Sequence, residues 1–573
     1  MDRDTLLRWS VIALAGILFW QFGMPLLRGD KSEAMQTIAA EHYVNAPGFR
    51  ADILDSNSPG AAASGEADEL CELNGGRYVA QFSSRGAGLT HLFFTDKRYA
   101  NSAARDLSTT PDHERWRSFR TLFRPVGESH TDDQIRYDRF NWKLAEHSET
   151  NCTFVYEDEV ARIEKSFAVG ERPFEINVNT KITNRAPETR RHTASIETFA
   201  FHPNSEIHGK LGRVSPFQTE LSCASGKEVV RKGKDDFKQG WASSPSVNRY
   251  AAVSNYYFAQ ALIPLDDQRP ECRILAEDWY GANQHRDDDE AGAVYHAQLV
   301  YPTRFLGPNE TATYRQIAFM GPKEREILDR ADGGKAGLGE VINLGFFSPV
   351  AKVLVGALVF LHDHVTFGNW GLAIIALTIA LRILLFPLTW KSIQTTIAMR
   401  TLKPDLDALN ARFKNDAQAK NIAMMELYRK HGVNPFGGCL PQLVQMPVWF
   451  AMYTTLQTAA EMYNTKFLWF ADMSAPDKYY ILPLVLGAFM IVQQRLVPQQ
   501  GMDAVQQKMM TYMMPIIFTV MMLFLPAALG IYMLTNSVLG IVQQLAIEHI
   551  SPRTGTSGKG EIIIKQSSHE LRR

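Results

Sequence analysis

The chain has 573 residues, with 60 Lys and Arg against 61 Asp and Glu, so its formal net charge at pH 7 is −1. This balance gives no sign of a nucleic-acid partner, and the length exceeds that of one ordinary domain. The mean hydropathy of −0.18 hides an asymmetry. The middle of the chain is polar and charged, whereas residues 1–27 and 346–548 are rich in apolar runs. The sequence therefore predicts a soluble block joined to a membrane block.

The first predicted element is a membrane helix at residues 9–27, which follows a short N-terminus, 1–8. Its nineteen residues carry no charge. At about 1.5 Å per residue they cover about 28 Å, close to the hydrocarbon thickness of a bilayer. Arg3 and Arg8 precede it, and no small-x-small cleavage site follows directly. This pattern favours an uncleaved signal anchor with a cytoplasmic N-terminus over a cleaved signal peptide.

Residues 28–345 would then lie outside the inner membrane. Residues 53–68 are rich in Ser, Ala, Gly and acidic residues and read as a linker. The segment 77–94, RYVAQFSSRGAGLTHLFF, indicates a strand, a glycine turn and a second strand. A further strand is indicated by apolar residues that alternate along one face, namely Phe174, Ile176, Val178 and Ile182. No long amphipathic helix interrupts 77–320, so we expect an antiparallel β-sandwich.

Four of the five cysteines lie in this exported block, at Cys71, Cys152, Cys223 and Cys272. Outside the membrane they can form two disulfides with three possible pairings, or remain free buried thiols. The histidines do not cluster at metal-ligand spacing. His362 and His364 are two residues apart, and two such residues do not share a helix face. No metal site is expected.

Residues 346–366 predict an amphipathic helix that lies on the outer membrane face. Ser348 is placed as a capping serine, followed by Pro349 where a missing N–H costs nothing. Apolar residues follow at helical spacing, but the uncharged run from Val353 to Leu361 is too short to span a bilayer.

Five further spans are expected in the membrane block, at 368–390, 436–459, 479–497, 509–526 and 528–548. With the anchor they make six, so both termini share a side. The segment 391–435 carries eight Lys and Arg residues, and the tail 549–573 is also basic, whereas 460–478 carries two lysines. The positive-inside rule therefore places 391–435, the loop 498–508 and the tail in the cytoplasm, and 460–478 outside.

The cytoplasmic segment 391–435 predicts a basic helical hairpin. Its first helix has a coiled-coil seam, formed by Leu402, Leu406, Leu409 and Phe413. Its second helix would present Ile422, Met425 and Tyr428 and end at Gly432. The hairpin is either a solvated connector or a docking surface for a cytoplasmic partner or an incoming chain.

The span 368–390 contains one charge, Arg382. It lies nine residues before Lys391, about 13 Å along a helix axis. An arginine at the centre of a membrane helix costs roughly 2.5–3.5 kcal/mol on insertion scales. The other spans offer few carboxylates, since Glu461 lies outside and Glu548 at the far end. We therefore expect no strong counter-ion, and a water-filled cavity around the guanidinium.

Other polar side chains could build such a cavity. Thr378 is four residues before Arg382 on the same helix face. The remaining polar positions are Gln442, Gln445, Gln493, Gln494, Thr519, Tyr532, Thr535, Asn536, Gln543 and Gln544. For any single glutamine the plain alternative is hydrogen bonding between helices. Fifteen of the 20 methionines lie between 424 and 533, and they suit either varied apolar partners or simple lipid contact.

Three segments resemble the YidC family of membrane protein insertases. They are NPFGGCLPQLVQMPVWFAMYTTL at 434–456, RILLFPLTWKSIQTTIAMRTLKPDLDALNARF at 382–413, and MPIIFTVMMLFLPAALGIYMLTNSVLGIVQQ at 514–544. The N-terminal anchor and large exported domain are similar to the Gram-negative form with its large periplasmic domain. The resemblance covers essentially the whole chain and is strongest over 368–548.

The resemblance implies a polytopic α-helical membrane protein with a five-helix insertase core and a periplasmic all-β supersandwich. That β fold is shared with sugar-binding proteins, but fold alone licenses no sugar ligand. The implied hydrated groove is positively charged and open to cytoplasm and lipid. The expected groove residues are Arg382, Thr378, Gln445, Tyr532, Thr535 and Asn536. The expected hydrophobic slide is Trp449, Met452 and Met521. Where many relatives have two adjacent aromatic residues, this chain has Tyr532 and then Met533.

The expected function is insertion of transmembrane segments and short N-terminal tails into the bacterial inner membrane, without enzyme activity, cofactor or nucleotide hydrolysis. No GxxxxGK[ST] motif is present. The expected partners are nascent membrane proteins, the ribosome, the Sec translocation channel and the lipid bilayer, with no small-molecule substrate and a functional monomer. Two alternatives stay open: a secondary transporter or channel for a small anion, and a membrane-anchored sugar enzyme.

Overall fold

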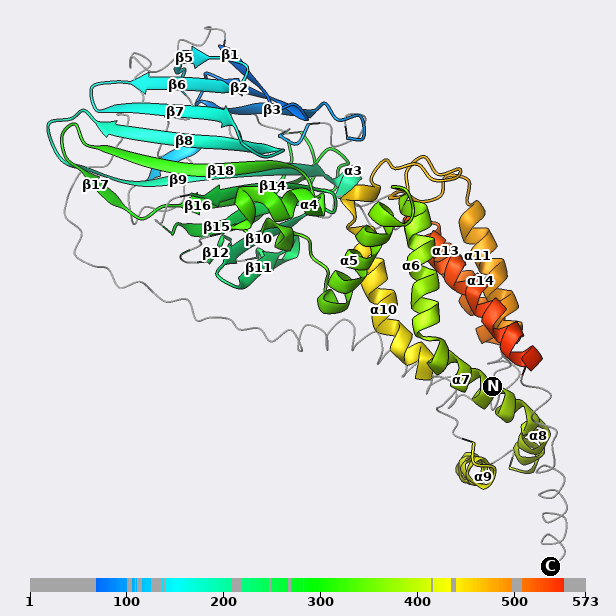
Figure 1. Ribbon diagram of the computed structural model, residues 1–573. Coiled ribbons are helices and arrows are strands. Elements are labelled where there is room, and N and C mark those ends of the chain that lie inside the picture. The colour runs from blue at the N-terminus through cyan, green and yellow to red at the C-terminus, as the bar shows by residue number, and fades with distance from the viewer. Residues whose placement is uncertain are drawn as a thin grey trace, which may run out of the picture.

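The computed structural model describes residues 68–550 except 100–105, 109, 111–115, 125–136, 138–139, 208–218, 239, 245, 247–248, 266–268, 282, 414–415, 434–439 and 497–507. The expected anchor 9–27, nearly all of the linker 53–68 and the tail after 550 lie outside these residues. The described chain has two parts, a body of β-sheets and an array of helices that extends from one end of it (Figure 1).

The β-rich part contains three sheets whose paired strands are antiparallel. The smallest has the order β1-β2-β3, with bounds β1 Leu70–Asn74, β2 Tyr78–Ser83 and β3 Gly88–Phe94. The largest has the order β11-β10-β13-β14-β18-β8-β7-β6-β5, with bounds β5 Lys143–His147, β6 Asn151–Glu157, β7 Ala161–Val169, β8 Glu175–Asn184, β10 Glu220–Ser225, β11 Glu228–Lys232, β13 Tyr250–Ser254, β14 Phe258–Pro264 and β18 Thr311–Pro322.

The third sheet has the order β12-β15-β16-β9-β17, and β4 also pairs with β9. Its bounds are β4 Thr121–Arg124, β9 Arg190–Pro203, β12 Ala242–Ser244, β15 Glu271–Trp279, β16 Gly292–Val300 and β17 Arg304–Leu306. Strands β13 and β14 of the largest sheet pack against β9 and β16 of this one. Two short helices lie between strands, α3 Asn204–Ile207 and η4 Lys234–Asp236, and three follow the last strand and lead to α5, namely α4 Arg325–Arg330, η5 Ala331–Gly334 and η6 Leu338–Val341.

The predicted strands are confirmed where the structure describes them, except that Phe174, which the alternation places in the strand, precedes β8 and has φ +64°. In β8, Ile176, Val178 and Ile182 are at most 1% exposed, while Asn177, Asn179 and Lys181 on the opposite face are partly exposed. The segment 77–94 forms β2 and β3, which pair with a register shift after Gln81. Gly86 in the connecting turn has φ +69°, a conformation that a glycine adopts without steric cost. Period-two patterning therefore locates these strands correctly.

Two disulfides tie the β-rich part together, and they resolve the pairing that the sequence leaves open. Cys71 of β1 is bonded to Cys152 of β6, which links the small sheet to the largest one. Cys223 of β10 is bonded to Cys272 of β15, which links the largest sheet to the third. Each bond therefore crosses between two sheets.

Breaking these bonds is expected to destabilise the β-rich part substantially. The linked cysteines are 81 and 49 residues apart, and loops of that size correspond to about 4 kcal/mol of stabilisation each on the chain-entropy estimate. Urea unfolding of the full chain with and without reductant measures the effect. Replacing Cys223 and Cys272 together by alanine should give an intermediate midpoint, and equal midpoints for all three samples would contradict the prediction.

The helical part follows the sheets in the chain. Its bounds are α5 Ser348–His364, α6 Trp370–Leu384, α7 Phe386–Thr401, α8 Lys403–Arg412, α9 Ala417–Lys430, α10 Leu440–Gln457, η8 Ala460–Met462, α11 Ile481–Leu496, η9 Met509–Met513, α13 Met514–Met522 and α14 Ala527–Ile550. Within the described residues, α14 is long and apolar enough to cross a membrane. The pair α6 and α7 also passes by length and composition but is bent by 63°, and Ile481–Leu496 and Met509–Met522 are shorter apolar helices.

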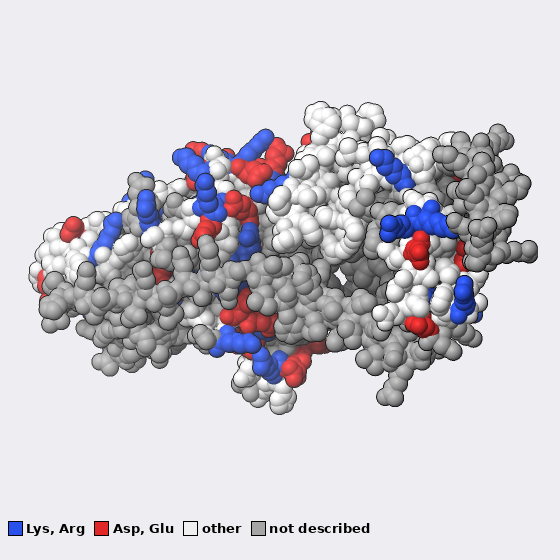
Figure 2. Space-filling view, turned by 90° about the horizontal axis from the view of Figure 1, so that it is seen from below, with Lys and Arg blue, Asp and Glu red and all other residues white. Residues whose placement is uncertain are grey.

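The surface of the helical part is apolar over much of its length. Figure 2 shows charged side chains in two regions of one face, separated by a broad uncharged expanse. Among the large apolar residues exposed on α6, α11 and α13 are Leu372, Ile379, Ile383, Leu484, Val492, Ile516, Ile517 and Val520. Such a belt is expected where lipid tails replace water as the solvent.

Helix α5 packs on α6 and α10 through Ala351, Leu354 and Leu358 and leaves Val353 71% exposed. It therefore has the two faces that the sequence predicts. The capping assignment was wrong: Ser348 is the first helical residue, and the preceding cap position makes no side-chain hydrogen bond. The proline still occupies the first turn, where its missing N–H has no helical acceptor to lose.

The predicted helix 368–390 is not continuous. Helix α6 ends at Leu384, Leu385 leaves helical geometry, and α7 begins at Phe386. Pro387 explains the break, because it has no N–H for the carbonyl of Ile383 and its ring crowds that position. Arg382 therefore lies in the last turn of α6, and a depth counted along a straight helix to Lys391 does not hold.

The cytoplasmic hairpin prediction is half right. Helices α8 and α9 pack together, with Leu402, Leu406 and Tyr428 buried between them, and Gly432 has φ +64° just after α9. However, Ile422 is 61% and Met425 is 55% exposed. The side chains that face α8 instead are Met424 and Leu427. Both sets are apolar at helical spacing, so the sequence pattern alone does not select the inward face.

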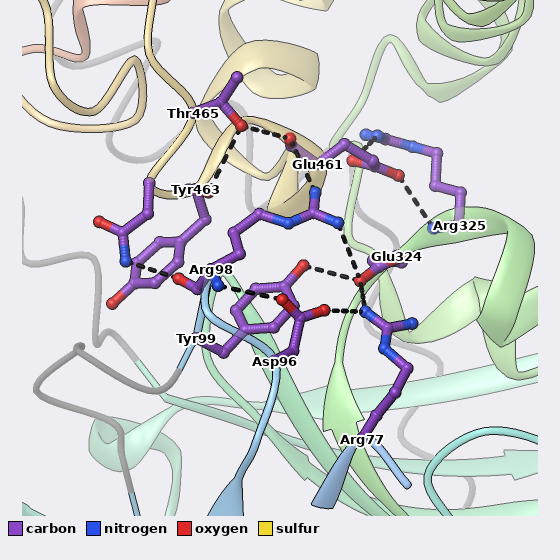
Figure 3. Close-up of polar contacts among 10 residues, drawn as sticks. Arg77, Asp96, Arg98, Tyr99, Glu324, Arg325, Glu461, Tyr463 and Thr465 are labelled. Carbon is purple, nitrogen blue, oxygen red and sulfur yellow. Dashed lines mark hydrogen bonds and ion pairs between the residues drawn. The ribbon is translucent and has the colours of Figure 1, made fainter. Parts of the chain in front are cut away.

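A polar junction joins the β-rich part to the loop 460–478 (Figure 3). The Glu461 carboxylate accepts hydrogen bonds from the Arg325 backbone N–H at 2.9 Å and guanidinium at 2.8 Å. Arg98 Nη1 donates to the Glu461 carbonyl at 3.2 Å, and its Nη2 lies 3.6 Å from Glu324. The buried Tyr99 hydroxyl donates to Glu324 at 2.8 Å, and burial raises the pKa of Tyr99 far above its usual value.

Candidate functional site

The guanidinium of Arg382 is held by side chains of α14. Its Nε donates to the Asn536 Oδ1 at 2.7 Å, and its Nη2 donates to the Asn536 carbonyl at 2.7 Å. Its Nη1 donates to the Gln543 Oε1 at 3.2 Å. From α10, Gln445 Nε2 donates to the same Asn536 Oδ1 at 3.0 Å. The three helices α6, α10 and α14 thus meet at one polar cluster, defined by Arg382, Gln445, Asn536 and Gln543.

The spacing of residues along α14 explains why the cluster forms. Tyr532, Asn536, Gly540 and Gln543 are separated by four, four and three residues, so they follow one stripe of the helix. A Cβ atom on Gly540 would lie 3.1 Å from Arg382 Nη2 and 3.0 Å from Gln493 Nε2. The missing side chain at Gly540 therefore creates the space in which the guanidinium lies flat against α14.

The cluster lies near the middle of the longest apolar helix. Asn536 is about 14 Å along the axis from the start of α14 and about 21 Å from its end, at about 1.5 Å per residue. Although Arg382 is close to the end of α6, its side chain points back toward the N-terminus of its helix, as helical side chains do. The charge is therefore brought to the centre of α14.

All partners of the Arg382 guanidinium are neutral amide or carbonyl groups. Among the residues that the structure describes, no Asp or Glu forms an ion pair with it. A hydrogen-bonded cation with no resident anion keeps its long-range attraction for negative charge. The site can therefore attract an anionic group without first displacing a carboxylate.

The structure separates the predicted groove residues into two groups. Arg382, Gln445 and Asn536 come together, as described above. Thr378 is 1% exposed, and its hydroxyl donates to the Ile374 carbonyl of its own helix at 2.7 Å, a common arrangement for helical threonine. Thr535 lies beside the α14 stripe rather than on it. Tyr532 is on the stripe and 2% exposed, and its side chain is hydrogen-bonded to Gln445, so it adjoins the cluster.

The three predicted slide residues differ in exposure. Met521 on α13 is 37% exposed, and Trp449 on α10 is partly buried and stacks on Tyr453 with ring centroids 6.0 Å apart. Met452 is 0% exposed. A substrate can therefore reach Met521 directly, whereas Met452 is enclosed by the bundle.

From the sequence, Gln543 is counted among the polar positions that could surround Arg382 but not among the expected groove residues, and Gly540 is left out altogether. The signal for Gln543 is its spacing of seven residues from Asn536, two helical turns on the same face. Gly540 has no such polar signal, because its contribution is empty space. Only the position of the Arg382 guanidinium across the helix interface reveals it.

Filling the space at Gly540 is expected to displace the guanidinium. In Gly540→Leu the new side chain occupies the position of Arg382 Nη2, and we expect insertion of a substrate with an acidic tail to fall about tenfold, which corresponds to about 1.4 kcal/mol. Replacing a mid-helix glycine also favours the helix itself, so a loss would not come from helix instability. Insertion into proteoliposomes is the measurement.

The matched control for this prediction is Gly356→Leu on α5. A Cβ there meets no atom within 4 Å, so insertion should remain at the wild-type level. Equal activity of Gly540→Leu and the wild-type protein would show that the position of the guanidinium does not matter.

The described residues contain no group of three His, Cys, Asp or Glu side chains placed to hold a metal ion. The two histidines at the end of α5 have other contacts. His362 stacks on Trp370 with ring centroids 3.8 Å apart, and His364 stacks on Phe360 at 4.8 Å.

A disulfide-bonded β-rich domain joined to a set of apolar helices, with the Arg382 guanidinium held by neutral groups among them, indicates a membrane protein with a large domain outside the bilayer. Two family sequence profiles match the chain, one described as 60Kd inner membrane protein over 360–554 and one described as YidC periplasmic domain over 74–357.

Two relatives agree with these profiles. The membrane protein insertase YidC of Anaeromyxobacter dehalogenans strain 2CP-C is 35% identical over 396 residues, which are 67% of each chain. That of Geotalea uraniireducens strain Rf4 is 32% identical over 484 residues, 83% of this chain and 86% of the relative. A crystal structure of an active YidC insertase with its first transmembrane domain resolved covers 84% of this chain and 92% of that chain, at 17% identity and a TM-score of 0.36.

The chain belongs to the YidC family of membrane protein insertases. It is an inner membrane protein with a β-rich periplasmic domain and a C-terminal helical insertase region. Its function is membrane protein insertion, which is not an enzymatic reaction, and its substrates are nascent membrane proteins. The resemblance seen in the sequence and the function that it implied are confirmed.

Proposed function

We propose that the polar cluster around Arg382 is the point at which a substrate's polar N-terminal tail is received on its way across the inner membrane. A polar tail loses hydration in lipid at high cost, because its backbone groups and charges have no partners there. A hydrated, positively charged groove open to cytoplasm and lipid shortens that dry path. The observation that supports this best is a mid-bundle guanidinium bound by neutral groups.

The identity of the partners favours transient binding. Asn536 and Gln543 orient the guanidinium through hydrogen bonds but do not cancel its charge. An acidic or carbonyl-rich tail can thus be attracted and released again, whereas a resident carboxylate would compete with it. Gln445 connects the cluster to α10. It would give the substrate tail a second polar contact beside the guanidinium.

The apolar part of the substrate would leave sideways along α13 and α10. Met521 is exposed on α13 next to Val520, which is 50% exposed, and both can contact a substrate helix. Methionine side chains adapt to varied apolar partners. Burial of the substrate segment in lipid, with any membrane potential, would drive the step without nucleotide hydrolysis.

The finer topology also belongs to this proposal. We place six spans in the membrane, with the N-terminus and C-terminus in the cytoplasm, the large domain in the periplasm and α5 along the outer face. The basic segment 391–435, including α8 and α9, would face the ribosome, and the Sec channel would cooperate for larger substrates. A monomer would suffice, because one copy of the chain contains all residues of the cluster.

Photocrosslinking during synthesis of a short membrane protein tests the path. A crosslinking residue at Met521 or Trp449 should form adducts with the nascent chain. The same residue at Met452, which is enclosed, should give few. Absence of adducts at Met521 and Trp449, or equal labelling at Met452, would contradict the proposed path.

A further inference from the structure

A cavity of about 240 Å³ lies where the periplasmic domain meets one end of α10. Its lining comes from three parts of the chain. The domain contributes β10, β13 and the residues beside them, Gly233 after β11, and Lys323 after β18. The other two parts are the segment that leads into α5, and the last turn of α10 with the residue that follows it. The junction of α5, α10 and the domain can be followed in Figure 1. The space is large enough for several waters or one small polar group.

The cavity contains a buried cation. Lys323 lines it and is 3% exposed. Among the described residues its ammonium has one hydrogen-bond acceptor, the Asn255 carbonyl at 2.9 Å. An ammonium has three N–H donors, so two remain for a ligand. Burial lowers the pKa of Lys323 to about 7, because a charge taken out of water is costly, although the nearby Glu220 acts in the opposite direction. A bound anion would remove that cost.

A carboxylate of opposite sign lines the same cavity. Glu220 Oε1 accepts a hydrogen bond from Asn343 Nδ2 at 2.9 Å, and Oε2 lies 3.7 Å from Arg231 Nε. Its side chain is 29% exposed, so a positively charged group can approach it. Thr458, just after α10, also lines the cavity, and its hydroxyl donates to the Thr454 carbonyl at 2.8 Å, so its oxygen can still accept a hydrogen bond.

The position of the cavity indicates the source of its ligand. The residues from α10 that line it, Thr454, Gln457 and Thr458, lie at the end of that helix nearer the periplasmic domain. In an inner membrane protein this is the level of the outer lipid headgroups. A ligand with one negative and one positive group would satisfy both charged walls.

We propose that this cavity binds a phosphoethanolamine headgroup, with the phosphate against Lys323 and the ammonium against Glu220. The shared chemistry is that of a phosphate ester with a primary ammonium, whether it belongs to a lipid or to a free solute. The inference is independent of the polar cluster in the bundle, because none of the cluster residues lines the cavity.

Native mass spectrometry of the full chain in detergent tests the proposal, with phosphatidylethanolamine and phosphatidylglycerol of the same acyl chains as probes. We expect the wild-type protein to retain phosphatidylethanolamine about tenfold better than phosphatidylglycerol. One additional charge-assisted hydrogen bond, from the lipid ammonium to Glu220, would account for a difference of this size. Lys323→Met should lower retention of both lipids, whereas Glu220→Gln should remove the preference between them. Lys352→Met, on the exposed face of α5, is the matched control and should change neither.

A competition arm separates the two sources. Soluble phosphoethanolamine that displaces the lipid at equal concentration would assign the site to a free solute, and failure to displace it would assign the site to a lipid headgroup. Wild-type protein without a preference, or with the same preference after Glu220→Gln, would overturn the proposal. If Lys323→Met does not fold, the Glu220→Gln result alone decides, because that side chain is partly exposed.

Discussion

Replacement of Arg382 by alanine is expected to reduce insertion of substrates with acidic N-terminal tails by about tenfold or more, since an attraction of about 1–4 kcal/mol between opposite charges near 4 Å is lost. Substrates with neutral tails should be affected less. Initial rates in proteoliposomes, with two versions of one substrate that differ only in tail charge, measure the effect. The comparison between the two tails is decisive, because a general folding defect would lower the insertion rates of both substrates equally.

Arg382→Lys distinguishes charge from geometry. The guanidinium makes three hydrogen bonds to two residues of α14, and two of them, from Nε and Nη2, clamp Asn536. A lysine ammonium keeps the charge but cannot reproduce this planar fork. We expect partial activity with acidic tails. Full activity would mean that charge alone matters, and activity equal to that of Arg382→Ala would mean that the orientation set by Asn536 is essential.

Local patterns in the sequence predict much of this structure. The alternation in β8 fixes which side chains are buried, because period two leaves one face for the core. The 4-4-3 spacing in α14 likewise determines which residues can share a face with Asn536. In both cases the information lies within one element. The absence of a carboxylate partner for Arg382 could also be predicted, because few acidic residues occur in the apolar segments.

Features that depend on two elements could not be derived in this way. The pairing of Cys71 with Cys152 depends on which strands are neighbours across sheets, and no local pattern records that. The inward face of α9 depends on how α8 approaches it. Arg325 and Glu461 are 136 residues apart, so their pairing was invisible. The bend at Leu385 could have been predicted from the sequence, because Pro387 is a local signal for a helix break. The continuous apolar character of 368–390 led to the prediction of one straight helix instead.

The junction also connects the periplasmic domain with the insertion machinery. Loop 460–478 follows α10, which carries Gln445 and Trp449, and precedes α11. By holding Glu461, the domain fixes the end of α10 nearest to it. Aromatic contacts beside the ion pair also hold the loop against the domain. Tyr463 stacks on Tyr99 with ring centroids 6.0 Å apart, and its ring centroid lies 4.9 Å from that of Tyr257.

Glu461→Gln is expected to loosen this junction strongly. The side chains of Arg325 and Glu461 are 15% and 13% exposed, and loss of one partner from such an enclosed pair costs about 3–5 kcal/mol because the other charge remains buried. Backbone amides in 460–478 should then exchange with deuterium at least about a hundredfold faster, as the opening free energy falls by that amount. Hydrogen–deuterium exchange mass spectrometry of the full chain is the measurement.

Helix α4, which begins with Arg325, also provides the matched control. Glu326 pairs with Arg330 at 2.7 Å, but both side chains are 74% exposed, and an exposed pair contributes little. Glu326→Gln should therefore leave exchange in 460–478 unchanged. The double variant Arg325→Met with Glu461→Met should recover part of the protection, because apolar groups can replace a buried pair at little cost. If Glu461→Gln behaves like Glu326→Gln, the pair does not hold the loop, and the aromatic contacts of Tyr463 must fix it instead.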